Sequence, residues 1–144
     1  MIEVRRTVPS DVPKIDPKAI YFDNPHVLSN VLEASKKHMT YTFVGHLGDV
    51  IAIVGYKPIH QFAGEFWAVT SDKVSMYPVE FHRTCLELLD LFLETNKIVR
   101  VQMVVKSGYY PGIKWAEALG FRFEGVLKSY GFDGSDYVMM GRVK

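Results

Sequence analysis

The sequence predicts a single α+β domain over residues 1–144, in which a mixed, mostly antiparallel central sheet is flanked by helices. Three observations predict this class. An apolar strand candidate at residues 98–105 leads into a short helix that closes on Leu119-Gly120-Phe121, and two further strand candidates follow. Between Pro78 and Asn96, apolar residues recur three and four positions apart, the spacing of a helix that packs one face on a core. The run Val50–Val54 is apolar throughout, as expected of a central strand buried on both faces.

The other elements follow in order along the chain. Ser10 can cap a first helix, because its hydroxyl can accept from free amides of the first turn, and Pro17 stops that helix. Asn24 caps a second helix that Pro25 opens. The turn between the last two strands is Asp133-Gly134, since both residue types tolerate positive φ. The strand candidates are residues 2–8, 41–46, 50–56, 65–70, 98–105, 121–130 and 135–143. The expected order is β-α-α-β-β-β-α-β-α-β-β.

The composition is typical of a globular protein and argues against several classes. A formal charge of +1 gives no reason to expect a nucleic-acid partner. No window approaches the roughly 20 apolar residues of a membrane span, and no signal peptide opens the chain, so we expect a cytoplasmic protein with no membrane partner. The histidines show no metal-ligand spacing, so no metal is expected. The lone Cys85 lies in the apolar stripe of the long helix and should be buried.

This order of elements resembles the GCN5-related N-acetyltransferase (GNAT) superfamily over essentially the whole chain. Residues 4–15 resemble its first strand and helix start, and residues 115–125 resemble its fourth helix and the following strand. Residues 67–74 and Lys114-Trp115 are similar to GNAT-like proteins of tailed phages, some of which are internal virion proteins. The resemblance implies a GNAT-like (acyl-CoA N-acyltransferase) fold and transfer of an acetyl group from acetyl-CoA to a small-molecule or protein amine. A phage origin would add a virion partner and the host cytoplasm, and the sequence leaves a homo-oligomer open.

The turn before the long helix departs from the family pattern. GNAT enzymes have a glycine-rich turn there, whose amides cradle the pyrophosphate of coenzyme A, but residues 71–83 contain no glycine. Glu80 and His82 stand roughly where the two glycines would be. The residues at this turn that are candidates for cofactor binding are Lys73, Phe81, His82 and Arg83. The basic side chains can bind phosphate, or they are simply solvated residues near a helix start.

The fourth strand offers a second set of cofactor-binding candidates. In this fold the pantetheine arm pairs with that strand as an added β-strand would, where the fourth and fifth strands splay apart. The matching residues are Ala68, Val69 and Thr70. Because the contact is made by main-chain groups, it depends little on side chains. A fourth-strand amide near Val69 is also the expected donor to the oxyanion of the reaction.

The resemblance also suggests catalytic residues. Many family members protonate the departing thiolate with a tyrosine at a position that is Ala116 here, so Tyr109 and Tyr110 are displaced candidates for this acid. A phenol with a pKa near 10 can donate a proton while staying neutral at pH 7; alternatively, these rings pack a loop before Pro111. Glu65 on the fourth strand is the candidate general base for the amine, and its alternative is to point into solvent.

Three functions therefore stay open from the sequence. The first is an acetyl-CoA-dependent N-acetyltransferase. The second is a GNAT-fold protein that has lost catalysis and binds a partner, for example in a virion, because a fold alone does not fix a function. The third is a protein that binds acyl-CoA without transfer. A catalyst must keep the cleft between strands four and five open, whereas a structural protein is free to fill it with Met76, Tyr77 or Tyr110.

Overall fold

A computed structural model describes residues 2–144, without the side chains of residues 22 and 23. Within these residues, seven strands form one sheet in the order β1-β2-β3-β4-β5-β7-β6. Its neighbouring strands are antiparallel except β4 and β5, which are parallel. The strands are β1 (Glu3–Arg6), β2 (Met39–Val44), β3 (Val50–His60), β4 (Ala63–Thr70), β5 (Arg100–Lys106), β6 (Arg122–Leu127) and β7 (Tyr137–Val143). The α-helices are α1 (Val27–Lys37), α2 (Pro78–Asn96) and α3 (Tyr110–Ala118), and the 3-10 helices are η1 (Pro9–Lys14), η2 (Ala19–Asp23) and η3 (Asp72–Met76).

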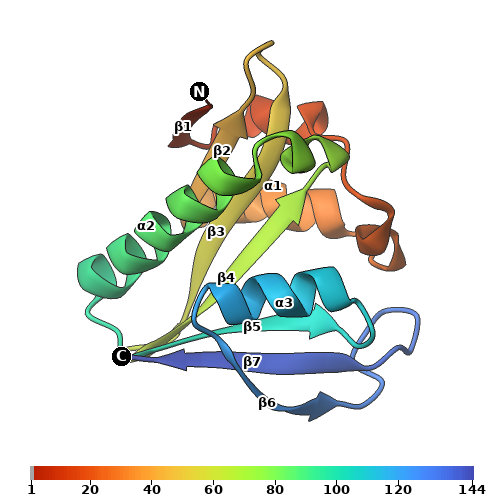
Figure 1. Ribbon diagram of the computed structural model, residues 1–144, viewed down its shortest axis with the longest axis vertical. Helices are drawn as coiled ribbons and strands as arrows, with labels where there is room; N and C mark the ends of the chain where they lie inside the picture. The colour runs from red at the N-terminus through yellow and green to blue at the C-terminus, as the bar shows by residue number, and fades with distance from the viewer. Residues whose placement is uncertain (1) are drawn as a thin grey trace.

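Helices cover both faces of the sheet (Figure 1). On one face, α2 and α3 pack on the larger core, and on the other face α1, η1 and η2 pack on a smaller core around Val31, Ile53 and Val69. The predicted mixed, mostly antiparallel sheet flanked by helices is confirmed, as is the order of its elements. Residues Val50–Tyr56 of β3 are buried, as the apolar run predicts.

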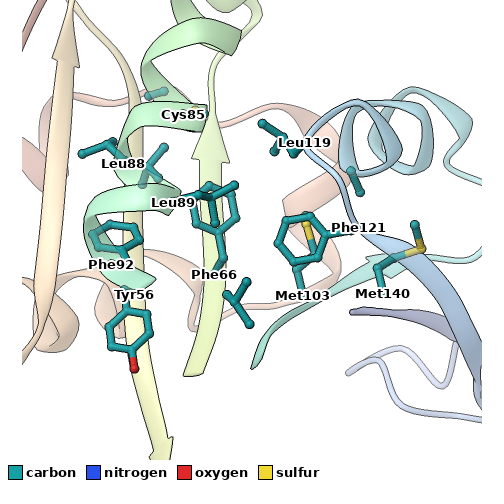
Figure 2. Close-up of a cluster of buried hydrophobic side chains, with 14 of the residues drawn as sticks. Tyr56, Phe66, Cys85, Leu88, Leu89, Phe92, Met103, Leu119, Phe121 and Met140 are labelled. Carbon is teal, nitrogen blue, oxygen red and sulfur yellow. The ribbon is translucent and has the colours of Figure 1, made fainter. Parts of the chain in front are cut away.

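The larger core is built around the apolar stripe of α2 (Figure 2). The ring of Phe92 lies 5.4 Å from that of Tyr56 and 6.3 Å from that of Phe66, centroid to centroid. The helix begins at Pro78 and ends at Asn96, as predicted. Proline is tolerated there because the first helical amides have no intrahelical partner. The predicted burial of Cys85 is confirmed, since this residue is 0% exposed.

The N-terminal helices differ from the prediction in how they start. Ser10 does not cap η1; instead the carboxylate of Asp11 accepts the amide of Val8 at 2.9 Å. Asn24 accepts the amide of His26 at 2.9 Å, but α1 begins only at Val27. Prolines in both segments favour tight turns over a regular first α-helical turn. The Ser10 segment forms the 3-10 helix η1, whereas Pro25 lies in a turn just before α1.

The last hairpin is less regular than the Asp133-Gly134 turn predicts. Strands β6 and β7 pair only as far as Leu127 and Tyr137, so residues 128–136 form a longer loop. Gly134 does have a positive φ of 81°, but its amide donates to Gly131 within a turn inside that loop. The two-residue turn was therefore a wrong prediction for the connection, because loop-internal turns use the same residue types.

Strands β4 and β5 pair over a short stretch only, from Ala63–Glu65 of β4 to Arg100–Gln102 of β5. Beyond it the two strands diverge, and α3 lies over the gap (Figure 1). In the part of the chain that is described, no helix is both long and apolar enough to cross a lipid bilayer.

Candidate active site

A slot opens where β4 and β5 diverge, with a cavity of about 150 Å³. Side chains alternate between the faces of a strand, so the slot has two sides. Phe66 faces α2 and α3, since its ring contacts Phe92 and Trp115. Glu65 and Trp67 therefore face η2 and α1. The α3 side is lined by Met103, Val105, Tyr109, Gly112 and Trp115, and the η2 side by Ile20, Tyr21, Glu65, Trp67, Lys106 and Tyr137. The slot thus connects the two faces of the sheet.

None of the three residues considered as plugs lines the slot among the residues described. Met76 and Tyr110 point outward and are 69% and 67% exposed. Tyr77 packs on the turn between β2 and β3, where its ring lies 5.0 Å from that of His46 and its hydroxyl accepts the His46 amide at 3.3 Å. The cleft that a catalyst requires is therefore open.

Glu65 lies half-buried at the end of the paired part of β4, directly opposite Lys57 on β3. Burial raises the pKa of its carboxyl group, and the charge of Lys57 offsets this only in part. Glu65 does not point freely into solvent, because it lines the slot beside Tyr21 and Trp67. A carboxylate with a raised pKa holds a proton more strongly than an ordinary one, which suits a general base.

The two candidate acids differ in their placement. Tyr109 lies half-buried on the α3 side of the slot, whereas Tyr110 is outside it. Gly112 allows Tyr109 to lie close to α3, because a Cβ at Gly112 would meet the Tyr109 ring at 2.8 Å and Val105 at 2.9 Å. Geometry therefore brings Tyr109, but not Tyr110, to the cavity that Glu65 lines.

The three cofactor candidates on β4 differ in where their main-chain groups point. The Lys18 amide donates to the Thr70 carbonyl at 2.9 Å, and the Thr70 amide donates to the Tyr21 hydroxyl at 3.2 Å, so both groups of Thr70 are engaged away from β3. Because direction alternates along a strand, Val69 directs its groups to Ile53 on β3, and Ala68 directs its groups into the gap. Of the three residues, Ala68 is therefore the one whose amide, next to Val69, faces the gap.

The candidates near the start of α2 are more dispersed. Phe81 is 6% exposed and is packed between Phe43 and Trp115, with ring centroids 5.0 and 5.4 Å away, and its amide donates to Tyr77. Its side chain is therefore a core residue and is not available to a ligand. The ammonium of Lys73 lies 3.1 Å from Asp49 on the β2–β3 turn.

His82 is half-buried and Arg83 is exposed on the first turns of α2. The carboxylate of Glu80, which the resemblance places roughly where GNAT enzymes have a glycine, accepts the Ile2 amide at 2.9 Å. It is thus held at the β1 side of the helix. The amides of Val79 and Glu80 remain at the helix start without a partner four residues back, and such amides suit an anion.

Sequence reasoning missed several residues of the slot. Tyr21, Lys106 and Tyr137 line its η2 side, and Trp115 lines its α3 side. Tyr21 lies in η2, a stretch without helical or strand periodicity, so the pattern of the sequence gave no reason to assign it to the slot. The only signal in the sequence was an aromatic residue just before the second helix. Among the side chains that the structure describes, those of residues 22 and 23 being left out, no group of three or more His, Cys, Asp or Glu is arranged to hold a metal ion.

The comparisons with known proteins agree on the fold. No family model matches the sequence, and no curated protein matches it either. Among solved structures, Ard1 from Thermoplasma volcanium has a TM-score of 0.77 at 15% identity over 99% of this chain and 97% of its own. A GNAT-family acetyltransferase from Bacillus anthracis has a TM-score of 0.75 at 13% identity, over 99% and 94% of the two chains. A ribosomal-protein-alanine N-acetyltransferase from Brucella melitensis has a TM-score of 0.73 at 17% identity, over 99% of this chain and 99% of its own. This chain therefore has the GNAT fold.

Proposed function

We propose that this protein is an N-acetyltransferase that transfers an acetyl group from acetyl-CoA to an amine. The observation that carries this proposal is the open slot between β4 and β5, which has Glu65 on one side of the sheet and Tyr109 on the other. Between them, Ala68 directs its main-chain groups into the gap. A thioester and an amine can therefore meet in the slot from opposite faces of the sheet.

The residues of the slot match the steps of such a transfer. Glu65 takes a proton from the ammonium, and the freed nitrogen lone pair attacks the thioester carbonyl carbon. The Ala68 amide donates to the carbonyl oxygen as negative charge builds on it. The carbon–sulfur bond then breaks, and Tyr109 gives its phenolic proton to the leaving sulfur. The nitrogen loses its second proton as the amide forms, and this proton restores the Tyr109 phenol. The amide product and free thiol leave the slot, and the proton held by Glu65 passes to solvent.

Acetyl-CoA fits this chain better at its pantetheine arm than at its pyrophosphate. The arm can pair with the unpaired edge of β4 at Ala68, as an added strand would. The pyrophosphate would rest on the amides of Val79 and Glu80 at the start of α2, with His82 and Arg83 as the nearest basic side chains along that helix. The cosubstrate supplies the activated acetyl group.

Calorimetric titration with acetyl-CoA and with coenzyme A tests the cofactor, and release of free thiol with a panel of amines tests the transfer. We expect micromolar binding, and a loss of about 10²–10³ in kcat in Glu65→Gln with little change in acetyl-CoA affinity. Glu87→Gln, on the exposed face of α2, is the matched control. No heat change and no thermal stabilisation at millimolar acetyl-CoA would refute the proposal.

One observation favours the alternative, a GNAT-fold protein that binds a partner, such as a virion component, without transfer. In the glycine-free turn, the amides of Val74 and Tyr77 donate to Ser71 and Val74 within η3, so they are engaged inside the turn. This alternative predicts no thiol release with any amine. Binding of acetyl-CoA without thiol release would instead favour an acyl-CoA-binding protein.

A further inference from the structure

We propose that the acceptor is a monocationic amine with a small aromatic or other apolar body, held with its ammonium at Glu65 and its body against tyrosine and tryptophan rings. This inference rests on the proposed function, because it assigns the amine to the η2 side of the same slot. It specifies the acceptor more narrowly than an amine in general.

The charge of the slot sets the first requirement. Glu65 is the only acidic residue among the described residues that line the cavity. An ammonium is the natural counter-ion of a half-buried carboxylate, since hydrogen bonds between charged groups are shorter and stronger than neutral ones. The slot therefore favours a cation over a neutral or anionic acceptor.

Two acidic groups of the β6–β7 loop, Asp133 and Asp136, are already paired. Asp133 lies 3.1 Å from the ammonium of Lys106, which itself lines the cavity. Asp136, on the same loop, accepts the Ser129 amide at 2.8 Å and lies 3.5 Å from the ammonium of Lys128. Both carboxylates are already engaged, so neither offers a partner to the further charges of a polyamine.

Aromatic rings form the walls around this carboxylate. Tyr21, Trp67 and Tyr137 line the η2 side of the cavity together with Glu65. Trp67 can lie flat on the sheet because its indole occupies the space where a side chain at Gly55 would be. Ring faces attract a cation and bury an apolar body, so both parts of the proposed acceptor match these walls.

The loop between β6 and β7 adds a ring to this aromatic wall. The ring of Tyr130 lies 5.4 Å from that of Tyr137. The pKa of Tyr130 is raised, mainly by burial and to a smaller extent by the negative charge of Glu65. The phenol is thus close enough to Glu65 to sense its charge. On the same loop, the ring of Phe132 lies 5.9 Å from that of His26, just before α1.

The contact between Phe132 and His26 joins the β6–β7 loop, which carries Tyr130, to the segment that precedes α1. The whole slot has a cavity of about 150 Å³, about the volume of an apolar protein cavity that binds benzene, and the thioester takes part of this space. The body of the acceptor is therefore limited to a single ring or a short alkyl group. A peptide N-terminus would bring further backbone polar groups that the aromatic walls cannot satisfy.

Calorimetry on the full chain tests this inference with three probes: phenethylamine, 2-phenylethanol and spermidine. The alcohol has the same body without the charge, and spermidine has several charges without the ring. We expect phenethylamine to bind at least about 10-fold more tightly than either of the other probes. We expect its affinity to be about 10-fold lower for Glu65→Gln than for the unmodified chain. Tyr130→Ala should bind phenethylamine a few-fold more weakly, and Glu87→Gln should bind it as tightly as the unmodified chain does. Circular dichroism of each variant verifies its folding.

The outcomes separate this inference from the proposed function. Spermidine or 2-phenylethanol that binds as tightly as phenethylamine, or phenethylamine that binds equally to Glu65→Gln, overturns the inference. Suppose that acetyl-CoA binds and releases its thiol with spermidine or Ala-Ala-Ala as the acceptor, but not with phenethylamine. That result overturns the inference and leaves the transferase standing. Glu65-dependent phenethylamine binding without any acetyl-CoA binding supports the amine site and refutes the transferase.

Discussion

Replacing Asp11 by Asn tests how the first strand and η1 are attached to the sheet. Asp11 is 0% exposed, and its carboxylate accepts two bonds from the Arg5 guanidinium at 2.7 and 2.9 Å. It also accepts the Val8 amide at 2.9 Å and the Thr42 hydroxyl at 3.0 Å. One carboxylate thus joins β1, η1 and β2, and an amide side chain can satisfy only part of this network.

The pKa of Asp11 gives the magnitude. Its hydrogen bonds to Arg5 lower this pKa from 3.8 to about 2. At about 1.4 kcal/mol per pKa unit, the difference is worth about 2 kcal/mol of folding free energy. Because the folded pKa lies below the unfolded one, this stabilisation is fully present above the unfolded value and is lost as the pH falls through about 2.

Urea unfolding of the protein and of Asp11→Asn across pH 7 to 2 measures this contribution. At pH 7 we expect the variant to be about 2 kcal/mol less stable, and we expect the difference to shrink below about pH 4. Asp16→Asn, at a nearby exposed position, should change stability little. A loss below about 0.5 kcal/mol at pH 7, or a loss of the same size at pH 2 as at pH 7, would refute the reasoning.

Three further predictions follow from the site and the core. Because burial raises the pKa of Glu65, kcat/KM should fall as the pH drops through a pKa above that of an ordinary glutamate, and Glu65→Gln should remove this limb of the pH–rate profile. The buried Cys85 thiol has a raised pKa, so a thiol reagent should label it only after unfolding; rapid labelling of the native chain would contradict this. Phe92→Ala should cost about 3–5 kcal/mol in urea unfolding, because the ring is fully buried among other rings; a loss below about 1 kcal/mol would contradict the packing.

Long periodic segments were predictable from the sequence, whereas short ones were not. Both ends of α2 were correct, because its apolar stripe runs the length of the helix and Pro78 fits its first position. The segment that holds η2 has no periodicity, and its tyrosine contributes to the site through a contact with Thr70 that is distant in sequence. Such contacts between residues far apart along the chain leave no local pattern.

The direction of main-chain groups along β4 was also beyond the sequence. An alternating strand shows which side chains share a face, but not which amides point to the neighbour on the left or on the right. This parity depends on the register with β3, where Val69 lies opposite Ile53. A shift of one residue would have exchanged the roles of Ala68 and Val69 while leaving the apolar character of the strand unchanged.

The two ends of the proposed cofactor site depend on the sequence in different ways. At Ala68, the slot needs only main-chain groups and the divergence of β4 from β5, so many side chains are compatible with it. At the start of α2, a glycine-rich turn would present free amides, but here η3 uses the amides of Val74 and Tyr77 internally, which leaves those of Val79 and Glu80. Recognition of acetyl-CoA by this chain would therefore depend more on the pantetheine arm than on the pyrophosphate, because the first contact is preserved by the fold and the second is reduced by the sequence.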